Sequence, residues 1–178
     1  MAELWDVYDI NFVKTGRLHE RNVPLSKGDY HLVVHIWIVN SKGEFLITKR
    51  SPGIPWGGYW QATGGSALAG DESLTAALRE TREEIGVALD AAGGVLFKHF
   101  REKWHGRQSS SFVDVWLFQK DIAADDIVLQ PEETCDVMWA SKDEILRMRL
   151  DGMFLPPYMN LYFEELAAYC EQRFRVTQ

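Results

Sequence analysis

Residues 65–87 read GSALAGDESLTAALRETREEIGV. The middle of this stretch predicts a helix over residues 73–85, because its apolar side chains recur at the spacing of one helical face. Those side chains are Leu74, Leu78, Thr81 and Ile85. Gly86 follows directly and is a typical C-terminal stop for a helix. In front of the helix, residues 63–65 predict a glycine-rich loop whose backbone can approach a ligand closely.

Three glutamates lie on the other side of the predicted helix, in its last turns: Glu80, Glu83 and Glu84. Their i, i+3, i+4 spacing makes the carboxylates neighbours on the surface, where like charges cost roughly 0.2–0.5 kcal/mol per pair. The helix macrodipole disfavours each of these anions by about 0.3–1 kcal/mol more. We therefore interpret the cluster as a site for a divalent cation, and hard carboxylate oxygens suit Mg²⁺ or Mn²⁺. The alternative is a solvated acidic face that Arg79 and Arg82 partly neutralise.

The same stretch resembles the Nudix box, whose pattern is Gly, five residues, Glu, seven residues, and then Arg-Glu-aliphatic-x-Glu-Glu-x-Gly-aliphatic. Two positions differ from that pattern. Asp71 stands where the family has Glu, which keeps the charge on a shorter side chain. Thr81 stands where the family has an aliphatic residue, and it can face the core through its methyl group while its hydroxyl bonds a preceding carbonyl.

The resemblance implies an α/β fold, specifically an α/β/α sandwich around a mixed β-sheet. It implies a Mg²⁺-dependent hydrolase, with Mn²⁺ as a substitute, that cleaves a diphosphate linkage in a nucleoside diphosphate derivative or a related small pyrophosphate. The metal ligands it implies are Glu80, Glu83 and Glu84. The implied catalytic residues are Glu83, Glu80 and Arg79, and Arg79 would orient Glu83 by a charge-assisted hydrogen bond. Gly64 and Gly65 would shape the substrate loop, and one glutamate or a loop acid would serve as base.

From Trp5 to about Phe174 the chain resembles the Nudix branch related to isopentenyl-diphosphate isomerase. The matching features are the N-terminal hairpin, residues 31–37, the Lys49-Arg50 strand end, residues 56–60, and Trp139 followed by a helix. The isomerase needs a cysteine acid–base group and a metal-binding histidine after a tryptophan, but residues 60–66 here read WQATGGS. We therefore favour hydrolysis. Isomerase-like activity and a non-catalytic ligand-sensing module are the alternatives.

Three residues outside the box are candidates for substrate binding. Arg50 ends a predicted strand beside a proline-rich loop, and it pairs either with a phosphate or with an acid of the box. Trp104 and Arg107 combine an aromatic ring with a cation in a predicted hairpin loop, where a base or a phosphate could dock. An ordinary exposed loop is the alternative for these two residues.

Two histidines and two further acids are left with open roles. His31 stands where the isomerase has a metal ligand, but a hydrogen-bonded strand residue is the alternative. His35 is either a satisfied core histidine or part of the substrate cleft. Glu132 and Glu133 precede Trp139, where family members often keep an additional acid, although exposed loop charges explain them equally well.

The composition is that of a globular protein, with 46% hydrophobic and 25% charged residues in a chain of 178. We expect a single domain over residues 1–178 with an N-terminal hairpin extension over about residues 1–30. The formal net charge of -7 argues against stable binding to nucleic acid. It also means that a cation must intervene before an anionic substrate binds.

The remaining features indicate a cytoplasmic enzyme. Cys135 and Cys170 form no CxxC pair, so reduced thiols are expected. No run of about 18 apolar residues occurs, which predicts no membrane span, and the first residues lack the pattern of a signal peptide. The expected partner is a small-molecule diphosphate, and a homodimer stays open because related hydrolases are often dimers.

Strands are expected over residues 31–39, 44–49, 95–101, 111–119 and 137–140, with further helices over 141–147 and 158–174. Ser141 with Glu144 predicts a capping box at the start of the first of these helices. Hairpin-connected strands with helices between them predict a mixed sheet covered by helices.

Overall fold

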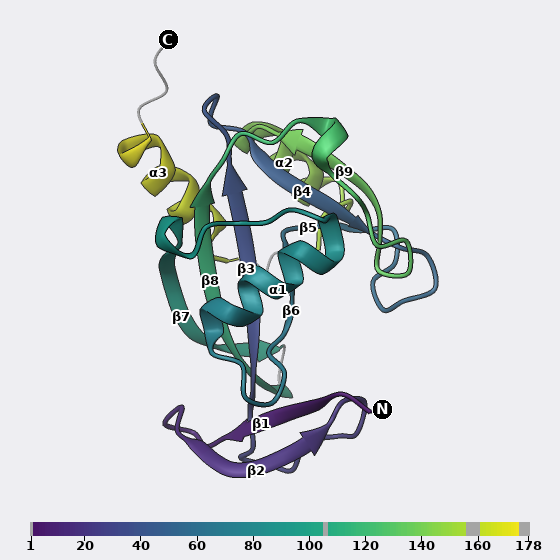
Figure 1. Cartoon of the computed structure of the whole chain (residues 1–178), viewed down its shortest axis with the longest axis vertical. Helices are drawn as coiled ribbons and strands as arrows, with labels where there is room; N and C mark the ends of the chain where they lie inside the picture. Colours follow the sequence, from purple (N-terminus) through teal and green to yellow (C-terminus); the bar gives the residue numbers. More distant parts are fainter. Residues whose placement is uncertain (1, 105–106, 156–160, 175–178) are drawn as a thin grey trace.

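The structure is a computed structural model that describes residues 2–104, 107–155 and 161–174, with the side chains of residues 103–109 outside that description. The strands are β1 (Leu4–Tyr8), β2 (Lys14–Glu20), β3 (His31–Val39), β4 (Phe45–Arg50), β5 (Trp60–Gln61), β6 (Thr63–Ser66), β7 (Val95–Trp104), β8 (Arg107–Gln119) and β9 (Thr134–Ala140). The helices are α1 (Ser73–Ile85), α2 (Lys142–Leu150) and α3 (Phe163–Arg173), with short 3₁₀ turns over Ala91–Gly93 and Ala124–Asp126. The main sheet has the order β5-β4-β3-β8-β7, with β6 paired to β3 and β9 paired to β4 (Figure 1).

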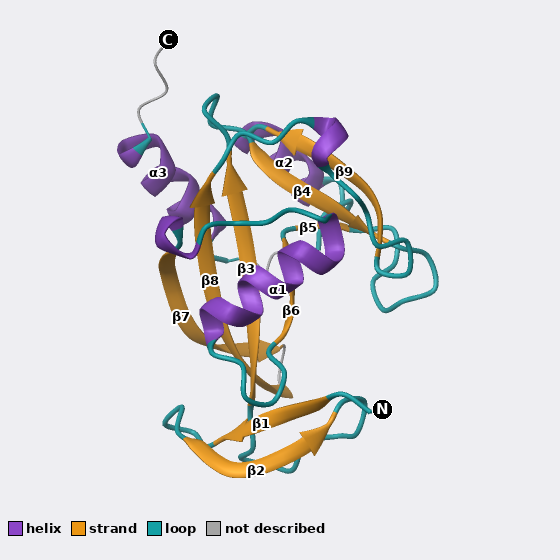
Figure 2. Ribbon diagram, in the orientation of Figure 1, coloured by secondary structure: helices purple, strands orange, loops and turns teal. Residues whose placement is uncertain are grey.

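Helices cover both faces of this mixed sheet, so the predicted α/β/α sandwich is confirmed (Figure 2). The side chains of β3 alternate between two apolar cores, as expected for a strand buried on both faces. The core under α1 contains Leu32, Val34, Ile36 and Ile38 together with Ala76, Ala77 and Ile85. The opposite core contains Trp37 and Val39 together with Ile145, Phe163 and Leu166 from α2 and α3.

Strand β3 pairs with two different neighbours along one edge. Val33–Ile36 pair with β6, whereas Ile38–Val39 pair with β4, so the sheet forks along β3. The glycine-rich loop expected over residues 63–65 is therefore wrong, because these residues belong to β6. Gly64 permits the pairing, since a Cβ at this position would lie 2.3 Å from the carbonyl oxygen of Val34. The strand with which these residues pair, β3, is distant in sequence, so local composition does not reveal the pairing.

Helix α1 has the predicted bounds and the predicted end. Gly86 has a φ of 71°, and its N–H donates to the carbonyl of Arg82 at 3.1 Å. This left-handed conformation favours glycine, because a Cβ would clash with the backbone. Thr81 is fully buried, and its hydroxyl donates to the carbonyl of Ala77 at 2.8 Å, as expected for a threonine that replaces an aliphatic residue.

The N-terminal hairpin forms a separate two-stranded sheet that lies against one end of the main sheet (Figure 1). Tyr8 and Tyr30 pair their backbones, and the ring of Trp5 stacks on His31 with 4.1 Å between centroids. The carbonyl of Leu4 accepts from the N–H of Ala69 at 2.7 Å, in the loop that leads to α1. These contacts hold the ends of β1 and β2 beside the fork of the sheet.

Several other elements depart from the expected bounds. β7 and β8 are longer than expected and meet in a hairpin where Trp104 pairs with Arg107. Helix α2 begins at the predicted Ser141–Glu144 capping box but continues to Leu150. Helix α3 begins at Phe163 rather than at residue 158, and residues 156–160 lie outside the described residues. None of the helices that the structure describes is long and apolar enough to cross a membrane.

Candidate active site

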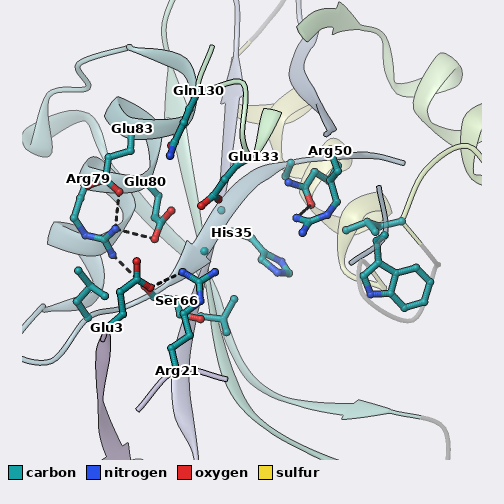
Figure 3. Close-up of a pocket in the computed structure, with 18 residues that line it drawn as sticks. Glu3, Arg21, His35, Arg50, Ser66, Arg79, Glu80, Glu83, Gln130 and Glu133 are labelled. Carbon is teal, nitrogen blue, oxygen red and sulfur yellow. Dashed lines mark hydrogen bonds and ion pairs between the residues drawn. The ribbon is translucent and has the colours of Figure 1, made fainter. Parts of the chain in front are cut away.

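A cleft of about 440 Å³ opens where the sheet forks. One wall comes from β6 and α1, the other from β4, β5 and the loop that joins them, and the rim includes the N-terminal hairpin and the loop before β9 (Figure 3). Its charged and polar lining residues are Glu3, Arg21, His35, Arg50, Gln61, Ser66, Arg79, Glu80, Glu83, Gln130 and Glu133. A volume of this size falls within the range of about 300–1,000 Å³ that is typical of small-molecule sites.

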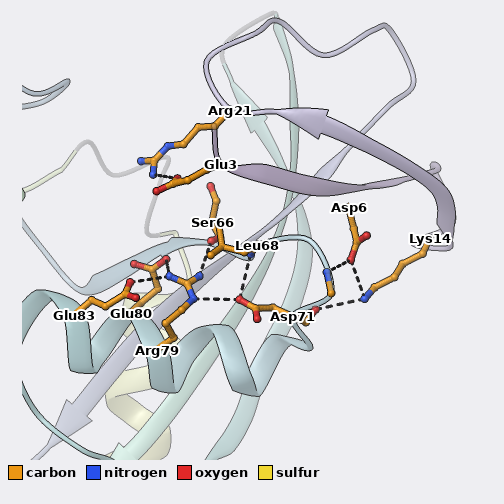
Figure 4. Close-up of polar contacts among 11 residues, drawn as sticks. Glu3, Asp6, Lys14, Arg21, Ser66, Leu68, Asp71, Arg79, Glu80 and Glu83 are labelled. Atoms are coloured by element: carbon orange, nitrogen blue, oxygen red, sulfur yellow. Dashed lines mark hydrogen bonds and ion pairs between the residues drawn. The ribbon is translucent and has the colours of Figure 1, made fainter. Parts of the chain in front are cut away.

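Arg79 ties the acidic end of α1 to the loop that precedes it (Figure 4). Its Nη1 donates to Glu80 Oε1 at 2.9 Å and to Glu83 Oε2 at 2.8 Å. Its Nε donates to Asp71 Oδ2 at 3.2 Å, and Nη2 donates to the carbonyl of Ser66 at 3.0 Å. The shorter Asp71 thus still reaches the arginine, and it also accepts from the N–H of Leu68 at 3.2 Å. The expected contact between Arg79 and Glu83 is present.

Glu80 and Glu84 are buried, which corrects the expectation of a cluster on the helix surface. They are 8% and 2% exposed, whereas the side chain of Glu83 is 51% exposed. Glu80 and Glu84 are one turn apart and face β6, while Glu83 lies on the outer side of the helix with Arg79. Gly65 of β6 leaves the necessary room, because a Cβ there would lie 2.4 Å from Glu80 Cδ.

Burial raises the pKa values of these two carboxylates. It raises the pKa of Glu80 to about 7, although the charge of Arg79 opposes the rise. Burial also raises the pKa of Glu84 well above its ordinary value, and the neighbouring carboxylates of Glu80 and Glu133 raise it further. The N–H of Gly64 bonds the Glu84 carboxylate and opposes this rise. Groups with acidities perturbed in this way concentrate at functional sites.

The chemistry of this donor set fits a divalent cation. Oε2 of Glu84 is buried without a hydrogen-bond partner, and an unpaired carboxylate oxygen is costly to bury. Together with Glu80 it provides hard oxygen ligands of the kind that Mg²⁺ and Mn²⁺ prefer, and the carboxylate of Glu133 lies nearby. In their present positions, no three acidic, histidine or cysteine side chains of the described residues converge on one ion. Glu83 is turned towards Arg79 and would have to leave it to act as a ligand.

Two arginines besides Arg79 provide positive charge at the cleft. Arg50 donates from Nη1 to Gln61 Oε1 at 3.0 Å and from Nε to the carbonyl of Pro55 at 2.8 Å, both neutral oxygens. Burial lowers the pKa of this guanidinium, while the charges of Glu84 and Glu133 oppose the change. Arg21 enters from the end of the N-terminal hairpin and pairs with the carboxylate of Glu3 at 2.5 Å.

Several lining residues were not predicted from the sequence, and they come from segments far from the box. Arg21 and Glu3 reach the cleft only because the hairpin docks against the sheet. Trp56 lines the wall opposite α1 with a φ of 63°, a strained conformation for so bulky a residue. Glu133, for which the sequence left two roles open, lies in the cleft, whereas its neighbour Glu132 is exposed outside it.

The other candidates fall into two groups. His31 does not line the cleft; it stacks under Trp5, and its Nε2 lies 3.0 Å from Ser111 Oγ. The sequence alternative of a hydrogen-bonded strand residue therefore applies to it. The side chains of Trp104 and Arg107 lie outside the described residues.

Comparisons with known proteins identify the family and the fold. The NUDIX domain model matches residues 29–158. A protein of Listeria monocytogenes named as an uncharacterized Nudix hydrolase is 38% identical over 156 residues, which cover 86% of this chain and 89% of the relative. The crystal structure of DR0079 from Deinococcus radiodurans shares the fold with a TM-score of 0.73 at 23% identity, over 94% of this chain and 99% of that chain.

The isomerase branch is also found among the relatives. An isopentenyl-diphosphate Delta-isomerase of Citrobacter koseri is 26% identical over 121 residues, which cover 66% of this chain and 65% of the relative. The box over residues 65–87 lies within the matched domain. The chain therefore belongs to the Nudix family, as a hydrolase with distant similarity to isopentenyl-diphosphate isomerases.

Proposed function

We propose that this Nudix hydrolase uses Mg²⁺, or Mn²⁺ in its place, to cleave a diphosphate linkage in a nucleoside diphosphate derivative or a related small pyrophosphate. The observation that carries the proposal is the unpartnered, buried Oε2 of Glu84 beside the carboxylates of Glu80 and Glu133. Such an arrangement is unfavourable in the metal-free protein and becomes favourable when a cation binds. Glu80, Glu83 and Glu84 would hold the ion, and Glu133 lies beside them in the cleft without being one of the proposed ligands.

A bound dication would neutralise charge on the phosphoryl oxygens and lower the pKa of a coordinated water. Arg79 keeps Glu80 and Glu83 in place through the two hydrogen bonds from its Nη1. Glu133 is carried by a separate loop and lies in the cleft beside the α1 acids. We assign it the role of a base that accepts the proton of the attacking water.

The cleft also resolves the conflict between a net charge of -7 and an anionic substrate. Arg50 donates its described hydrogen bonds to neutral oxygens. None of these bonds pairs its guanidinium with a carboxylate, so the group can bind a phosphate. Arg21 can exchange its contact with Glu3 for a contact with the substrate. Guanidinium groups suit this task, because their planar fork matches the geometry of phosphate oxygens.

Isomerisation of a prenyl diphosphate has less support from the site. Neither cysteine is among the residues that line the cleft: Cys135 is on β9 and exposed, and Cys170 is buried in α3 among the core side chains. Neither thiol is placed to protonate an alkene in the cleft.

The test is a substrate screen with Mg²⁺ that covers nucleotide sugars, dinucleoside polyphosphates, ADP-ribose, noncanonical triphosphates and prenyl diphosphates, with phosphate release and product mass as readouts. We expect cation-dependent hydrolysis that Glu84→Gln lowers at least about 100-fold. Glu133→Gln should also lose activity, while the neighbouring Glu132→Gln should keep it. Turnover that persists in EDTA, or a fully active Glu84→Gln variant, would contradict the proposal.

A further inference from the structure

A chain of hydrogen bonds runs from the core under α2 and α3 to the cleft. Nε1 of Trp37 donates to the hydroxyl oxygen of Tyr162 at 3.1 Å, and the same oxygen lies 2.7 Å from Nδ1 of His35. Trp37 is fully buried and Tyr162 is 3% exposed, so water does not compete for these groups. His35 lies at the other end of the chain and lines the cleft between Arg50 and Arg21 (Figure 3).

The donor inventory fixes the direction of this chain. An indole N–H can only donate, so the Tyr162 oxygen accepts from Trp37. The hydroxyl proton of Tyr162 then requires an acceptor, because a buried donor without one is costly. Among the described contacts, Nδ1 of His35 is the atom that can accept it. Nδ1 must therefore be unprotonated, and a neutral ring carries its proton on Nε2.

The surroundings keep both side chains in these protonation states. Burial lowers the pKa of His35 to about 4, so the ring is neutral at pH 7. Burial, together with the charge of Glu102, raises the pKa of Tyr162, although Arg149 opposes the rise, so the hydroxyl keeps its proton. Nε2 of His35 makes no hydrogen bond among the described contacts, and the ring that carries it lines the cleft (Figure 3).

We propose that His35 is a neutral hydrogen-bond donor that positions the substrate by donating Nε2–H to a non-bridging phosphoryl oxygen, and that Tyr162 is the positioning residue that fixes its tautomer. The inference rests on the proposed function for the identity of the acceptor. A neutral donor stabilises phosphoryl oxygens without repelling a cation beside them. It also cannot remove a proton from water through Nε2, which separates its role from that of Glu133.

The first experiment is independent of turnover. The full chain, labelled with ¹⁵N-histidine, is examined by NMR at neutral pH, and the His35 resonances are assigned from their loss in His35→Gln. We expect the Nδ1 shift of an unprotonated imidazole nitrogen and the Nε2 shift of a protonated one. Tyr162→Phe removes the donor and should convert His35 to a mixture of tautomers, whereas Tyr169→Phe in helix α3, which follows Tyr162, should not. A protonated Nδ1 in the wild type would overturn the assignment.

The second experiment tests the contact with the substrate. Binding of methylenediphosphonate with Mg²⁺ is compared among wild type, His35→Leu and His35→Gln, whose amide can replace the Nε2 donor. We expect about 10- to 100-fold weaker binding for His35→Leu, the worth of one hydrogen bond to a charged group, and recovery in His35→Gln. Equal binding by wild type and His35→Leu, or no binding by either, would overturn the inference. A protein that binds this probe but hydrolyses none of the panel would refute only the proposed reaction.

Discussion

The substitution Glu80→Gln tests the electrostatic reading of the site most directly. In the metal-free protein, burial raises the pKa of Glu80 from 4.5 to about 7. The folded state therefore holds a proton that the unfolded chain releases between these two values, and stability falls as the pH rises through that window. At 1.36 kcal/mol per pH unit, this corresponds to about 3 kcal/mol above pH 7. Glutamine has almost the same shape and does not ionise, so the variant avoids this penalty.

The assay is urea unfolding in EDTA at several pH values from 5 to 8. We expect Glu80→Gln to be more stable than wild type by up to about 3 kcal/mol at pH 8, with the gain shrinking towards zero at pH 5. Glu83→Gln is the matched control and should show no comparable gain, because its side chain is half exposed to water. Saturating Mg²⁺ should reverse the order by stabilising wild type more than Glu80→Gln.

Two results would refute this reasoning. If Glu80→Gln is no more stable than wild type at pH 8 in EDTA, the buried carboxylate does not destabilise the metal-free protein. If the gain is as large at pH 5 as at pH 8, it has another origin, such as improved packing. The hydrogen bond from Arg79 Nη1 to Glu80 becomes weaker with a neutral acceptor, so a gain somewhat below 3 kcal/mol is still consistent with the argument.

Three further predictions concern the same site. Glu83→Gln should lower kcat at least about 100-fold in a steady-state assay of a confirmed substrate, and retained turnover would argue against its role as a ligand. Millimolar Mg²⁺ should raise the melting temperature of wild type in a thermal melt but not that of Glu84→Gln, and EDTA should have no effect on the metal-free protein. Gly65→Ala should abolish activity, because its Cβ would lie 2.4 Å from Glu80 Cδ and would displace that carboxylate. Gly93→Ala is the control, since nothing lies within 4 Å of its Cβ position, and equal activity of the two variants in a steady-state assay would contradict this account.

The sequence predicts what depends on local periodicity and capping. Helix α1 and strand β3 have the expected bounds because apolar spacing, β-branched composition and Gly86 all act within a few residues. The capping box of α2 is confirmed for the same reason. The sequence pattern predicts too early an end for α2, and it wrongly predicts a loop for the glycine-rich segment 63–65. That segment becomes a strand only because β3 offers a pairing edge about 30 residues earlier.

The candidate site also combines features that local sequence predicts with features that depend on tertiary contacts. The identity of the α1 acids follows from their spacing, but their depth does not, because Glu80 and Glu84 are buried by the approach of Gly65 and β6. The helical spacing of the three carboxylates alone predicts that they are equivalent surface charges. Arg21 reaches the cleft through the docking of Trp5 on His31, a tertiary contact that no local pattern encodes.

The burial of Glu80 and Glu84 links the stability of the metal-free protein to the binding of the cation. A surface cluster of glutamates would be hydrated and screened, and a cation would gain little by binding to it. Burial removes that hydration from Glu80 and Glu84, so the metal-free protein carries an electrostatic penalty that cation binding relieves. The burial is imposed by the close packing of β6 against α1, which places Glu80 against Gly65. The energy that makes the metal-free site unfavourable is thus available to hold the ion, and with it a diphosphate, at the fork of β3.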